Sequence, residues 1–438
     1  MRKWIIGVLL LLLGSLLSRQ AVGQEPVTPW REDPVFQRLA TILDKVPAID
    51  MHSHLLRPGE FNPSLANVGP LQLRSTHPSL PTVIRQRFGV SPQPDNWQAT
   101  IKMIDAARNK MVARLGETGY WLNHLDFTVT EIALVNQYSR RGIDGKRLLW
   151  VPHATTLLFP LPADHLMERS PSHKRDITEA QQNLKEFLKE GGLAESPADL
   201  PSYVRFVDAT LRRWQQQGAV GIKFWDAYLR TLRIADVPAA RATILYSKGR
   251  TAPLSRDEYL AVQDYLWRHI LLEAGKINLP VHIHSSFGVP PFLRTLESDV
   301  RNLEDVLADP TFFQTQVVLI HGGAPWYEVA GYLALKPNVW IDTSAIAFLR
   351  PVPDFANILR QYLIFAPEKV LYGTDASAYP SVPGGADVHH LVVSRAARDG
   401  LYVALSSLIR DGVIDERQAL DMGRGVLREN ARRLHGWK

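Results

Sequence analysis

The chain has 438 residues, of which 45% are hydrophobic and 21% are charged, a composition typical of a globular protein with a sizeable core. Its formal net charge is only +6 and the basic residues are dispersed, which argues against nucleic acid as a partner. The sequence contains no cysteine, which excludes disulfides, thiolate metal sites and a lipid-anchor cysteine.

The N-terminal segment has the order of a secretory signal peptide. Arg2 and Lys3 precede an apolar run from Trp4 to Leu13, and the small residues of Ala21-Val22-Gly23 follow. This run is shorter than the ~20 residues that span a bilayer, which favours a cleaved leader over a membrane anchor. We therefore expect a signal peptide over residues 1–23, cleaved near Gly23, and an N-terminal extension over 24–46. The mature protein is then periplasmic or secreted, without stable membrane insertion.

Eight short apolar runs rich in Val, Ile and Leu follow along the chain. They show little strict alternation, as expected of buried parallel strands. The expected strands are Ala48–His54, Thr128–Val135, Leu148–Thr155, Ala219–Trp225, Pro280–Ser285, Val317–His321, Val339–Asp342 and Val370–Thr374. Helical patterns between them include Tyr203–Gln217, Asp257–Ala274, Tyr327–Leu335 and Phe355–Phe365. This alternation predicts an α/β fold, a TIM-like (β/α)₈ barrel over residues 47–438.

Three connections are longer than packing requires and are interpreted as insertions, at about residues 55–96, 157–201 and 227–255. The first and third follow strands one and four, so they lie at the C-terminal face, where barrel active sites are built. The first is rich in proline and glycine, and long loops of this kind are usually lids, binding loops or disordered. Beyond the eighth strand, Asp387–Arg410 and Asp415–Leu434 are expected to be extra packing helices, to which the sequence assigns no chemistry.

Histidines, a lysine and an aspartate occur where the expected strands end. His52 and His54 are two apart on an extended segment, so their side chains share one face and can bind one metal ion. The same pattern of polar ends continues in later strands, at Lys223, His282, His284, His321 and Asp375. Because the C-terminal ends of barrel strands converge on one mouth, we expect these residues to be neighbours.

The residue types fit a metal site better than coincidence. A single histidine at a strand end is more often a structural hydrogen-bonding residue, and a single aspartate is more often a helix cap or turn former. Together, however, neutral imidazoles and a carboxylate are good ligands for Zn²⁺ and similar divalent ions. A catalytic metal activates water, and Asp375 is the candidate to accept the proton of that water and return it.

The motifs also carry a resemblance to a known family. Asp50-Met51-His52-Ser53-His54, Lys223, His284, His321 and Gly373-Thr374-Asp375, in this order, resemble the amidohydrolase superfamily. The amidohydrolase-related branch, which also holds decarboxylases, lactonases and hydratases, is the most similar. The resemblance runs from about Pro47 to the segment Glu429–Leu434. It implies that His52, His54 and Asp375 hold one metal, while His284 and His321 either hold a second metal or orient the substrate.

The chemical state of Lys223 determines whether the predicted site holds one metal ion or two. In many binuclear members of the superfamily a strand-four lysine is carboxylated by CO₂ and bridges two metals. A free ammonium cannot ligate a cation, so Lys223 is either carboxylated or not a ligand. In the second case it pairs with a carboxylate such as Asp226 or binds an anionic substrate. His282 faces the same way as His284 but is the less well placed ligand.

Substrate contacts are harder to read from the sequence. Arg57, Trp225 and Arg350 follow strands one, four and seven, and an arginine there can hold a substrate carboxylate with two hydrogen bonds. Residues at such positions are more often ordinary surface or ion-paired residues. Trp326 and Tyr379 are candidates for lining a pocket, although aromatic residues at such positions often only pack.

The sequence thus predicts an exported hydrolase that uses a metal-activated water to cleave an amide, ester or lactone bond of a small molecule. The alternative is a metal-dependent decarboxylase or other lyase on the same barrel, because a fold by itself does not determine the reaction. An isomerase similar to uronate isomerases fits less well, because His321 ends strand six. A non-catalytic binding protein would not need the whole set of ligands. A homo-oligomer is compatible with the sequence.

Overall fold

The computed structural model describes residues 28–437, except 57–60, 66, 68, 70–72, 75–78, 94, 165, 167–170 and 287–292. The expected signal peptide, Arg57 and much of the proline-rich connection after the first strand lie outside the described residues.

A strand is present at each of the eight expected positions, and all of the strand pairs are parallel. The strands are β1 (Ala48–Ser53), β2 (Thr130–Asn136), β3 (Leu148–Val151), β4 (Ile222–Phe224), β5 (Val281–His284), β6 (Val317–Ile320), β7 (Val339–Asp342) and β8 (Val370–Leu371). They form a three-stranded sheet in the order β1-β2-β3 and a five-stranded sheet in the order β4-β5-β6-β7-β8.

The two sheets are linked at both of their edges. Isolated parallel bridges pair Trp150 with Ala219 and His153 with Lys223, which links β3 to β4. On the other side Ser53 pairs with Ala376, and the backbone N–H of Asp375 donates to the carbonyl oxygen of His52 at 2.7 Å. The expected TIM-like barrel is confirmed, and β1 lies beside the segment that follows β8.

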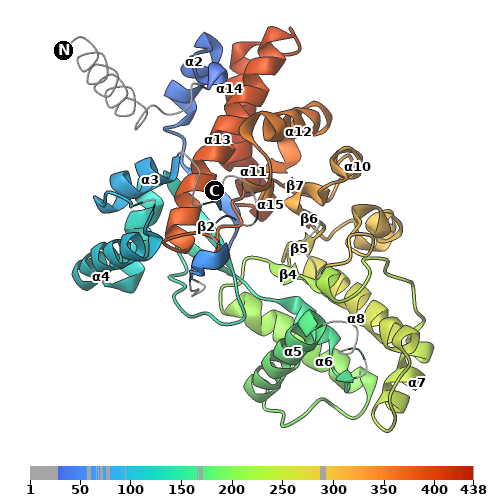
Figure 1. The fold of residues 1–438 in the computed structure, drawn as a ribbon. Coiled ribbons are helices and arrows are strands. Elements are labelled where there is room, and N and C mark those ends of the chain that lie inside the picture. Colours follow the sequence, from blue (N-terminus) through green and yellow to red (C-terminus); the bar gives the residue numbers. More distant parts are fainter. Residues whose placement is uncertain are drawn as a thin grey trace, which may run out of the picture.

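Helices lie between successive strands, except between β2 and β3, and cover them from outside (Figure 1). Their bounds are α2 (Pro34–Leu43), α3 (Ser79–Phe88), α4 (Trp97–Phe127), α5 (Pro171–Glu190), α6 (Leu200–Gln216), α7 (Ala239–Gly249), α8 (Arg256–Lys276), α9 (Glu304–Leu307), α10 (Tyr327–Leu333), α11 (Ile346–Leu349), α12 (Val352–Phe365), α13 (Ala386–Arg410), α14 (Glu416–Arg424) and α15 (Asn430–His435). The four helices named in the sequence analysis correspond to α6, α8, α10 and α12. Local chemistry accounts for their starts: Asp199 caps α6, and Ser255 with Glu258 forms a capping box on α8.

The long connections contain helices that the sequence pattern did not predict. The connection after β1 contains α3 and continues directly into α4, whose helical geometry is interrupted at Gly116 with φ 72°. The connections after β3 and β4 contain α5 and α7. In Figure 1, α3 and α4 lie on one side of the strands, whereas α5, α6, α7 and α8 form a group on another. Because the glycine break divides α4, its apolar residues do not form one continuous stripe that periodicity would reveal.

The barrel interior has an apolar core at the end where the strands begin. Ile49, Met51, Leu134, Val151, Val318, Ile320 and Leu371 of the strands form one buried cluster with Ala431 and Leu434 of α15. Val220, which precedes β4, packs against the same cluster. The C-terminal helix α15 therefore closes the N-terminal end of the barrel, and polar side chains gather at the opposite end.

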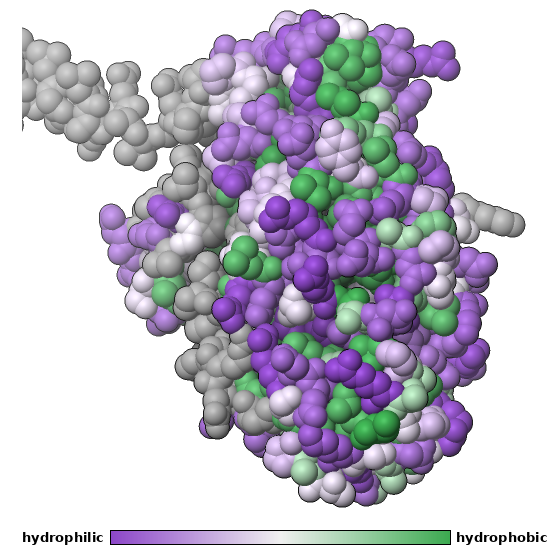
Figure 2. Space-filling view, turned by 90° about the vertical axis from the view of Figure 1, so that its right-hand side faces the viewer, coloured by the Kyte–Doolittle hydropathy of each residue, from purple (hydrophilic) through white to green (hydrophobic). Residues whose placement is uncertain are grey.

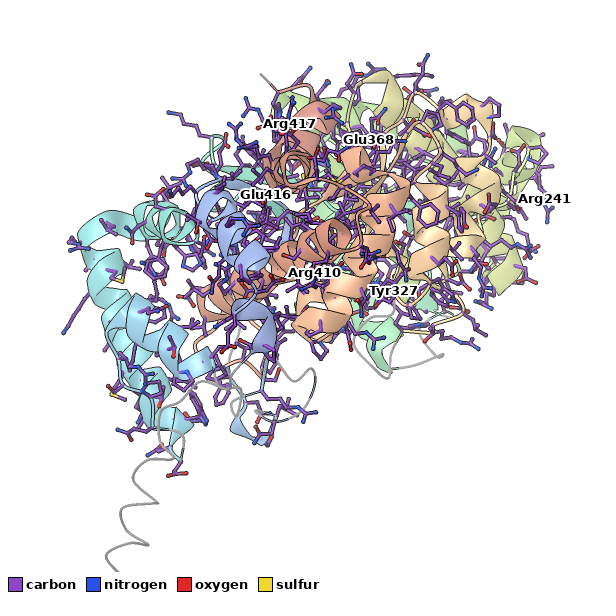
Figure 3. All side chains as sticks on the ribbon, turned by 90° about the horizontal axis from the view of Figure 1, so that it is seen from above. Arg241, Tyr327, Glu368, Arg410, Glu416 and Arg417 are labelled. Carbon is purple, nitrogen blue, oxygen red and sulfur yellow. The ribbon has the colours of Figure 1, made fainter. Side chains whose placement is uncertain are left out.

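The N-terminal helix α2 is attached to the C-terminal helices. Its Phe36, Leu39 and Leu43 are buried. At the surface Asp33 pairs with Arg410 of α13 at 2.6 Å, and Arg38 pairs with Glu416 of α14 at 3.0 Å; both partners are labelled in Figure 3. The described part of the N-terminal extension is thus packed on the barrel domain.

The surface shown in Figure 2 is largely hydrophilic, with hydrophobic residues scattered among the polar ones. Within the part of the chain that the structure describes, no helix combines the length and apolar character needed to cross a bilayer.

A tight glycine contact in the helical layer gives a stability prediction. A Cβ added at Gly400 of α13 would lie 2.3 Å from Cδ1 of Phe355 on α12. We expect Gly400→Ala to lower the free energy of unfolding by about 1–3 kcal/mol, because overpacking forces a side chain or backbone to shift. Urea unfolding followed by circular dichroism measures the change. The cost should shrink in a Phe355→Leu background, and an equal cost in both backgrounds would contradict this explanation.

Candidate metal centre

Three of the predicted ligands form one compact donor group. His52 and His54 at the end of β1 and Asp375 after β8 each offer a ligand atom, and these atoms all lie within 4.8 Å of one another. The Nε2 atoms of His52 and His54 lie 3.3 and 3.5 Å from the same oxygen, Oδ1 of Asp375. His52 and Asp375 are buried, and His54 is partly exposed. Two nitrogens and one oxygen therefore face a common point near the surface.

The two histidines predicted on β5 and β6 lie next to this group. The ring of His321 lies 5.2 Å from that of His52 and 4.7 Å from that of His284, measured between centroids. The ring of Tyr228, from the turn after β4, lies 4.6 Å from His284 on its other side. Both histidines are buried. They extend the polar surface of the mouth from β1 across to β5.

Hydrogen bonds occupy one nitrogen of several of these rings and leave the other for a ligand. Nδ1 of His54 lies 3.0 Å from the carbonyl oxygen of Asn136, and Nδ1 of His321 lies 3.0 Å from the Ser344 hydroxyl. Nε2 of His284 lies 3.1 Å from the carbonyl oxygen of Ser286. A carbonyl partner requires an N–H on the bonded nitrogen, so the remaining nitrogen carries a lone pair. This is how outer partners commonly orient metal-binding histidines.

Burial favours the neutral form of these groups. Burial and the nearby positive charge of Lys223 lower the pKa of His52 and of His284 well below the usual value. Burial raises the pKa of Asp375 above the usual carboxyl range, and the charge of Lys223 opposes this shift. Neutral imidazole is the form that binds metal ions. A bound cation would reverse the effect of burial on Asp375.

Lys223 lies inside the barrel beside this group. It is in register with His282 on β5 and is bridged to His153 after β3. Its side chain is buried, and Nζ has no hydrogen-bond partner within the described residues. Burial lowers the pKa of the Lys223 amine, and the carboxylates of Asp375, Asp342 and Asp226 partly offset this effect. The amine is thus close enough to Asp375 for their charges to interact.

Two of the predicted residues have an unusual backbone conformation. His321 has φ 66° and Asp375 has φ 55°, in the left-handed region that L-residues rarely adopt. Such conformations cost about 1–3 kcal/mol and cluster at functional sites. The turn at His321 also explains why β6 ends at Ile320, one residue earlier than expected.

Asp50, within the first motif, binds the segment after β8 that carries Asp375. Its Oδ1 accepts hydrogen bonds from the backbone N–H of Thr374 at 2.9 Å and of His52 at 3.2 Å. Its Oδ2 accepts from the Thr374 hydroxyl at 2.6 Å and lies 3.4 Å from Nε2 of His390 on α13. His390 in turn bonds to His124 of α4 at 3.0 Å. Asp50, His124 and His390 are fully buried.

Asp342, at the end of β7, is a polar residue that the sequence analysis placed in a strand without a role. It is fully buried, and its Oδ1 accepts hydrogen bonds from the backbone N–H and the hydroxyl of Ser344. Ser344 is also the partner of Nδ1 of His321. Burial raises the pKa of Asp342 to about 7. The sequence did contain a signal for Asp342, because this residue ends an apolar run as the other site residues do.

The residues predicted to contact the substrate do not gather at one place, as the donor residues do. Trp225 lies near the mouth, with its ring 6.4 Å from that of His153. Arg350 follows α11 and interacts with the Tyr327 hydroxyl. Tyr379 contacts the centre directly, since its hydroxyl donates to Oδ2 of Asp375 at 3.1 Å. Arg57 lies outside the described residues.

His282 does not join the donor group. It lies in register with Lys223 and Val318, one layer below His284 inside the barrel. It is fully buried, and burial, together with the charges of His435 of α15 and of Lys223, lowers its pKa well below the usual value. His282 thus faces the interior as expected, but toward the closed end.

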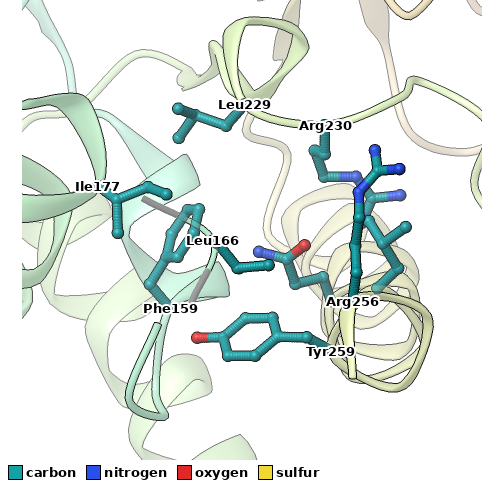
Figure 4. A pocket seen from close by; sticks show the side chains of 9 residues that line it. Phe159, Leu166, Ile177, Leu229, Arg230, Arg256 and Tyr259 are labelled. Atoms are coloured by element: carbon teal, nitrogen blue, oxygen red, sulfur yellow. The ribbon is translucent and has the colours of Figure 1, made fainter. Parts of the chain in front are cut away.

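A pocket elsewhere on the chain does not contain the candidate ligands. Its empty volume is about 320 Å³, and Figure 4 shows its lining residues from α5, α8 and the segments after β3 and β4. Arg230 lines it, but this guanidinium pairs with Asp264 and lies 3.9 Å from Asp226. The charge of Arg230 is therefore already balanced within the protein.

A second group of donors lies between α6 and α8 and consists of Asp208, His269 and Glu273. His269 Nε2 is 2.6 Å from Asp208 Oδ1, and Lys276 pairs with Glu273 at 2.6 Å. Arg212 lies 3.7 Å from Glu273. These ion pairs explain why the three residues lie together: they link α6 to α8.

Comparison with known proteins agrees with this architecture. The profile of a family described as amidohydrolase matches residues 197–437. The fold is similar to that of a Lactobacillus casei protein described as a metal-dependent hydrolase, with TM-score 0.60, 17% identity, and coverage of 91% of this chain and 97% of that one.

It is also similar to two isomerases. Glucuronate isomerase from Caulobacter crescentus has TM-score 0.61 and 13% identity, with coverage of 92% and 95% of the two chains. Uronate isomerase from Thermotoga maritima has TM-score 0.54 and 13% identity, with coverage of 91% and 97%. A search of curated proteins found no match. At these identities the solved structures establish the fold and not the reaction.

The contribution of the hydrogen bond from the Thr374 hydroxyl to Asp50 can be tested directly. Thr374→Val removes the hydroxyl donor and leaves the buried Oδ2 of Asp50 short of a partner. We expect the free energy of unfolding to fall by about 1–3 kcal/mol, the cost of an unsatisfied buried acceptor. Urea unfolding measures this change. Thr374→Ser keeps the hydroxyl and should retain most of the stability, whereas a Thr374→Val protein as stable as the wild type would contradict the role of this hydrogen bond.

Proposed function

The chain belongs to the amidohydrolase family, and from this premise we propose that it is an exported, metal-dependent hydrolase acting on a small molecule. The bond cleaved is C–N or C–O, as in an amide, ester or lactone. The observation that carries the proposal is the convergence of the Nε2 atoms of His52 and His54 on one oxygen of Asp375.

The chemistry of the donors fits a divalent ion, with Zn²⁺ as our proposed metal. His52, His54 and Asp375 would hold it, and their mixture of imidazole and carboxylate suits that ion. His284 and His321 would hold a second ion or orient the substrate. A bound Zn²⁺ supplies a Lewis acid and lowers the pKa of water to about 7. A bound cation would also stabilise the buried Asp375 carboxylate, which Lys223 alone stabilises only in part.

The chain's own residues would handle the proton. The Asp375 carboxylate, whose Oδ1 lies near the histidine nitrogens and whose Oδ2 is bound by Tyr379, would accept a proton from water and return it to a leaving group. The lone pairs left on the imidazoles of His54 and His321 face away from their backbone and hydroxyl partners. This arrangement supports the proposed catalytic roles of Asp375 and His321.

Lys223 would determine whether the site holds one ion or two. Burial favours its neutral amine, which is the form that reacts with CO₂. The absence of a hydrogen-bond partner for Nζ within the described residues leaves room for either outcome. A carboxylated Lys223 would be a bridging ligand, and an unmodified one would balance the charge of Asp375.

Metal content tests the site itself. We expect the purified protein to bind one or two divalent ions per chain, and His52→Ala to lose most of this metal because a central donor disappears. Elemental analysis after dialysis gives the number. His269→Gln, in the paired group between α6 and α8, is the matched control and should keep the wild-type content. Wild-type protein that binds no divalent metal would refute the proposal.

A substrate panel tests the reaction. We expect hydrolysis of at least one N-acyl amino acid, ester or lactone, and loss of at least about 100-fold in kcat in Asp375→Asn, since positioned proton transfer contributes about 10²–10⁴-fold. The same panel includes aromatic acids scored for CO₂ release and uronates scored for isomerisation. Turnover only in the CO₂ assay would support the lyase alternative, and turnover only of uronates would replace hydrolysis with isomerisation.

Export is proposed from the N-terminal sequence alone. Arg2, Lys3 and the apolar run from Trp4 to Leu13 would direct the chain out of the cytoplasm, with cleavage near Gly23. The mature protein would act on a small molecule in the periplasm or outside the cell, without a nucleic-acid partner.

A further inference from the structure

The two oxygens of Asp375 have different partners. Oδ1 lies 3.3 and 3.5 Å from the donor nitrogens of His52 and His54. Oδ2 accepts a hydrogen bond of 3.1 Å from the hydroxyl of Tyr379, four residues later in the chain. We propose that Tyr379 is a positioning residue of the metal centre, which holds the Asp375 carboxylate so that Oδ1, and not Oδ2, faces the histidines.

The ring of Tyr379 is fixed by packing on two sides. Its centroid lies 5.9 Å from that of Phe348 on α11 and 5.2 Å from that of His389 on α13. Phe348 and His389 also pack on each other at 4.9 Å. Three rings from the segments after β7 and β8 therefore support one another. A hydroxyl on a ring held in this way has a defined position relative to Asp375.

The loop between Asp375 and Tyr379 is held by the same helix. The backbone N–H of Ser377 donates to Nδ1 of His389 at 3.0 Å, and the N–H of Tyr379 donates to the carbonyl oxygen of Ser377 at 3.0 Å. His389 is fully buried, and burial lowers its pKa to about 3, so the ring is neutral and can accept this bond. A second contact, from Val382 N–H to the carbonyl oxygen of Tyr379 at 3.0 Å, continues the turn.

This geometry has a consequence for metal binding. A carboxylate can rotate about its bond to Cβ, which exchanges its two oxygens, unless a hydrogen bond distinguishes them. The Tyr379 hydroxyl makes this distinction, because it binds Oδ2 while the histidine nitrogens lie nearest Oδ1. Outer partners of metal ligands typically contribute about 10–100-fold to metal affinity or activity. The inference rests on the proposed function insofar as it assumes that Asp375 is a ligand.

The test uses Tyr379→Phe, which removes one oxygen and retains the ring that packs on Phe348 and His389. We expect the affinity for Zn²⁺, measured by competition with a chromophoric chelator, to fall about tenfold or more. The visible absorption spectrum of the Co²⁺-substituted protein should change, because the carboxylate no longer has a fixed orientation. For a substrate found in the panel, kcat should fall by more than KM changes.

Tyr332→Phe is the matched control, since this exposed tyrosine of α10 packs at a tilt against Phe365, away from the centre. It should leave the Zn²⁺ affinity and the Co²⁺ spectrum unchanged. A Tyr379→Phe protein with wild-type Zn²⁺ affinity and an unchanged Co²⁺ spectrum would overturn the inference while leaving the proposed function intact. Wild-type protein that binds neither metal would instead overturn the proposed function and this inference with it.

Discussion

The buried carboxylate of Asp50 is the contact on which the rest of the centre depends. It receives hydrogen bonds from both the backbone and the side chain of Thr374, and a further one from the backbone of His52. One side chain thereby fixes the end of β1 against the segment after β8. These are the two segments that carry His52, His54 and Asp375. If they separated, the three donors would no longer share a common point, however well each strand was formed.

The same carboxylate extends the support of the centre into the helical layer. His390 of α13 lies against Asp50, and His124 of α4 bonds to His390, so a helix from the long connection after β1 reaches the first motif through two side chains. Next to it, His389 and Tyr379 hold the loop after β8. The helices α4 and α13 thus do more than cover the sheet, because their inner residues set the positions of donors on other elements.

The mouth of the barrel contains several buried ionisable groups. Lys223, Asp375 and Asp342 are all buried, and burial shifts the pKa of each toward the neutral form. Buried charges are normally paired or coordinate a metal. The closed end of the barrel is apolar instead, since residues of α15 pack there against Met51 and Val318. The polar residues are therefore confined to the end where the loops can form a site.

The sequence by itself determined the eight strands, because buried parallel strands are short runs of Val, Ile and Leu. It also determined the placement of His52 and His54 on one face, because side chains two residues apart on a strand point the same way. Only the tertiary structure decided which strand ends meet. It brought Asp375 to His52 and His54, set His284 and His321 beside them, and placed His282 one layer lower. It also revealed Asp342, Tyr379 and His390 as partners of the centre. Barrel closure and left-handed turns at His321 and Asp375 produce these contacts, and neither leaves a periodic signal in the chain.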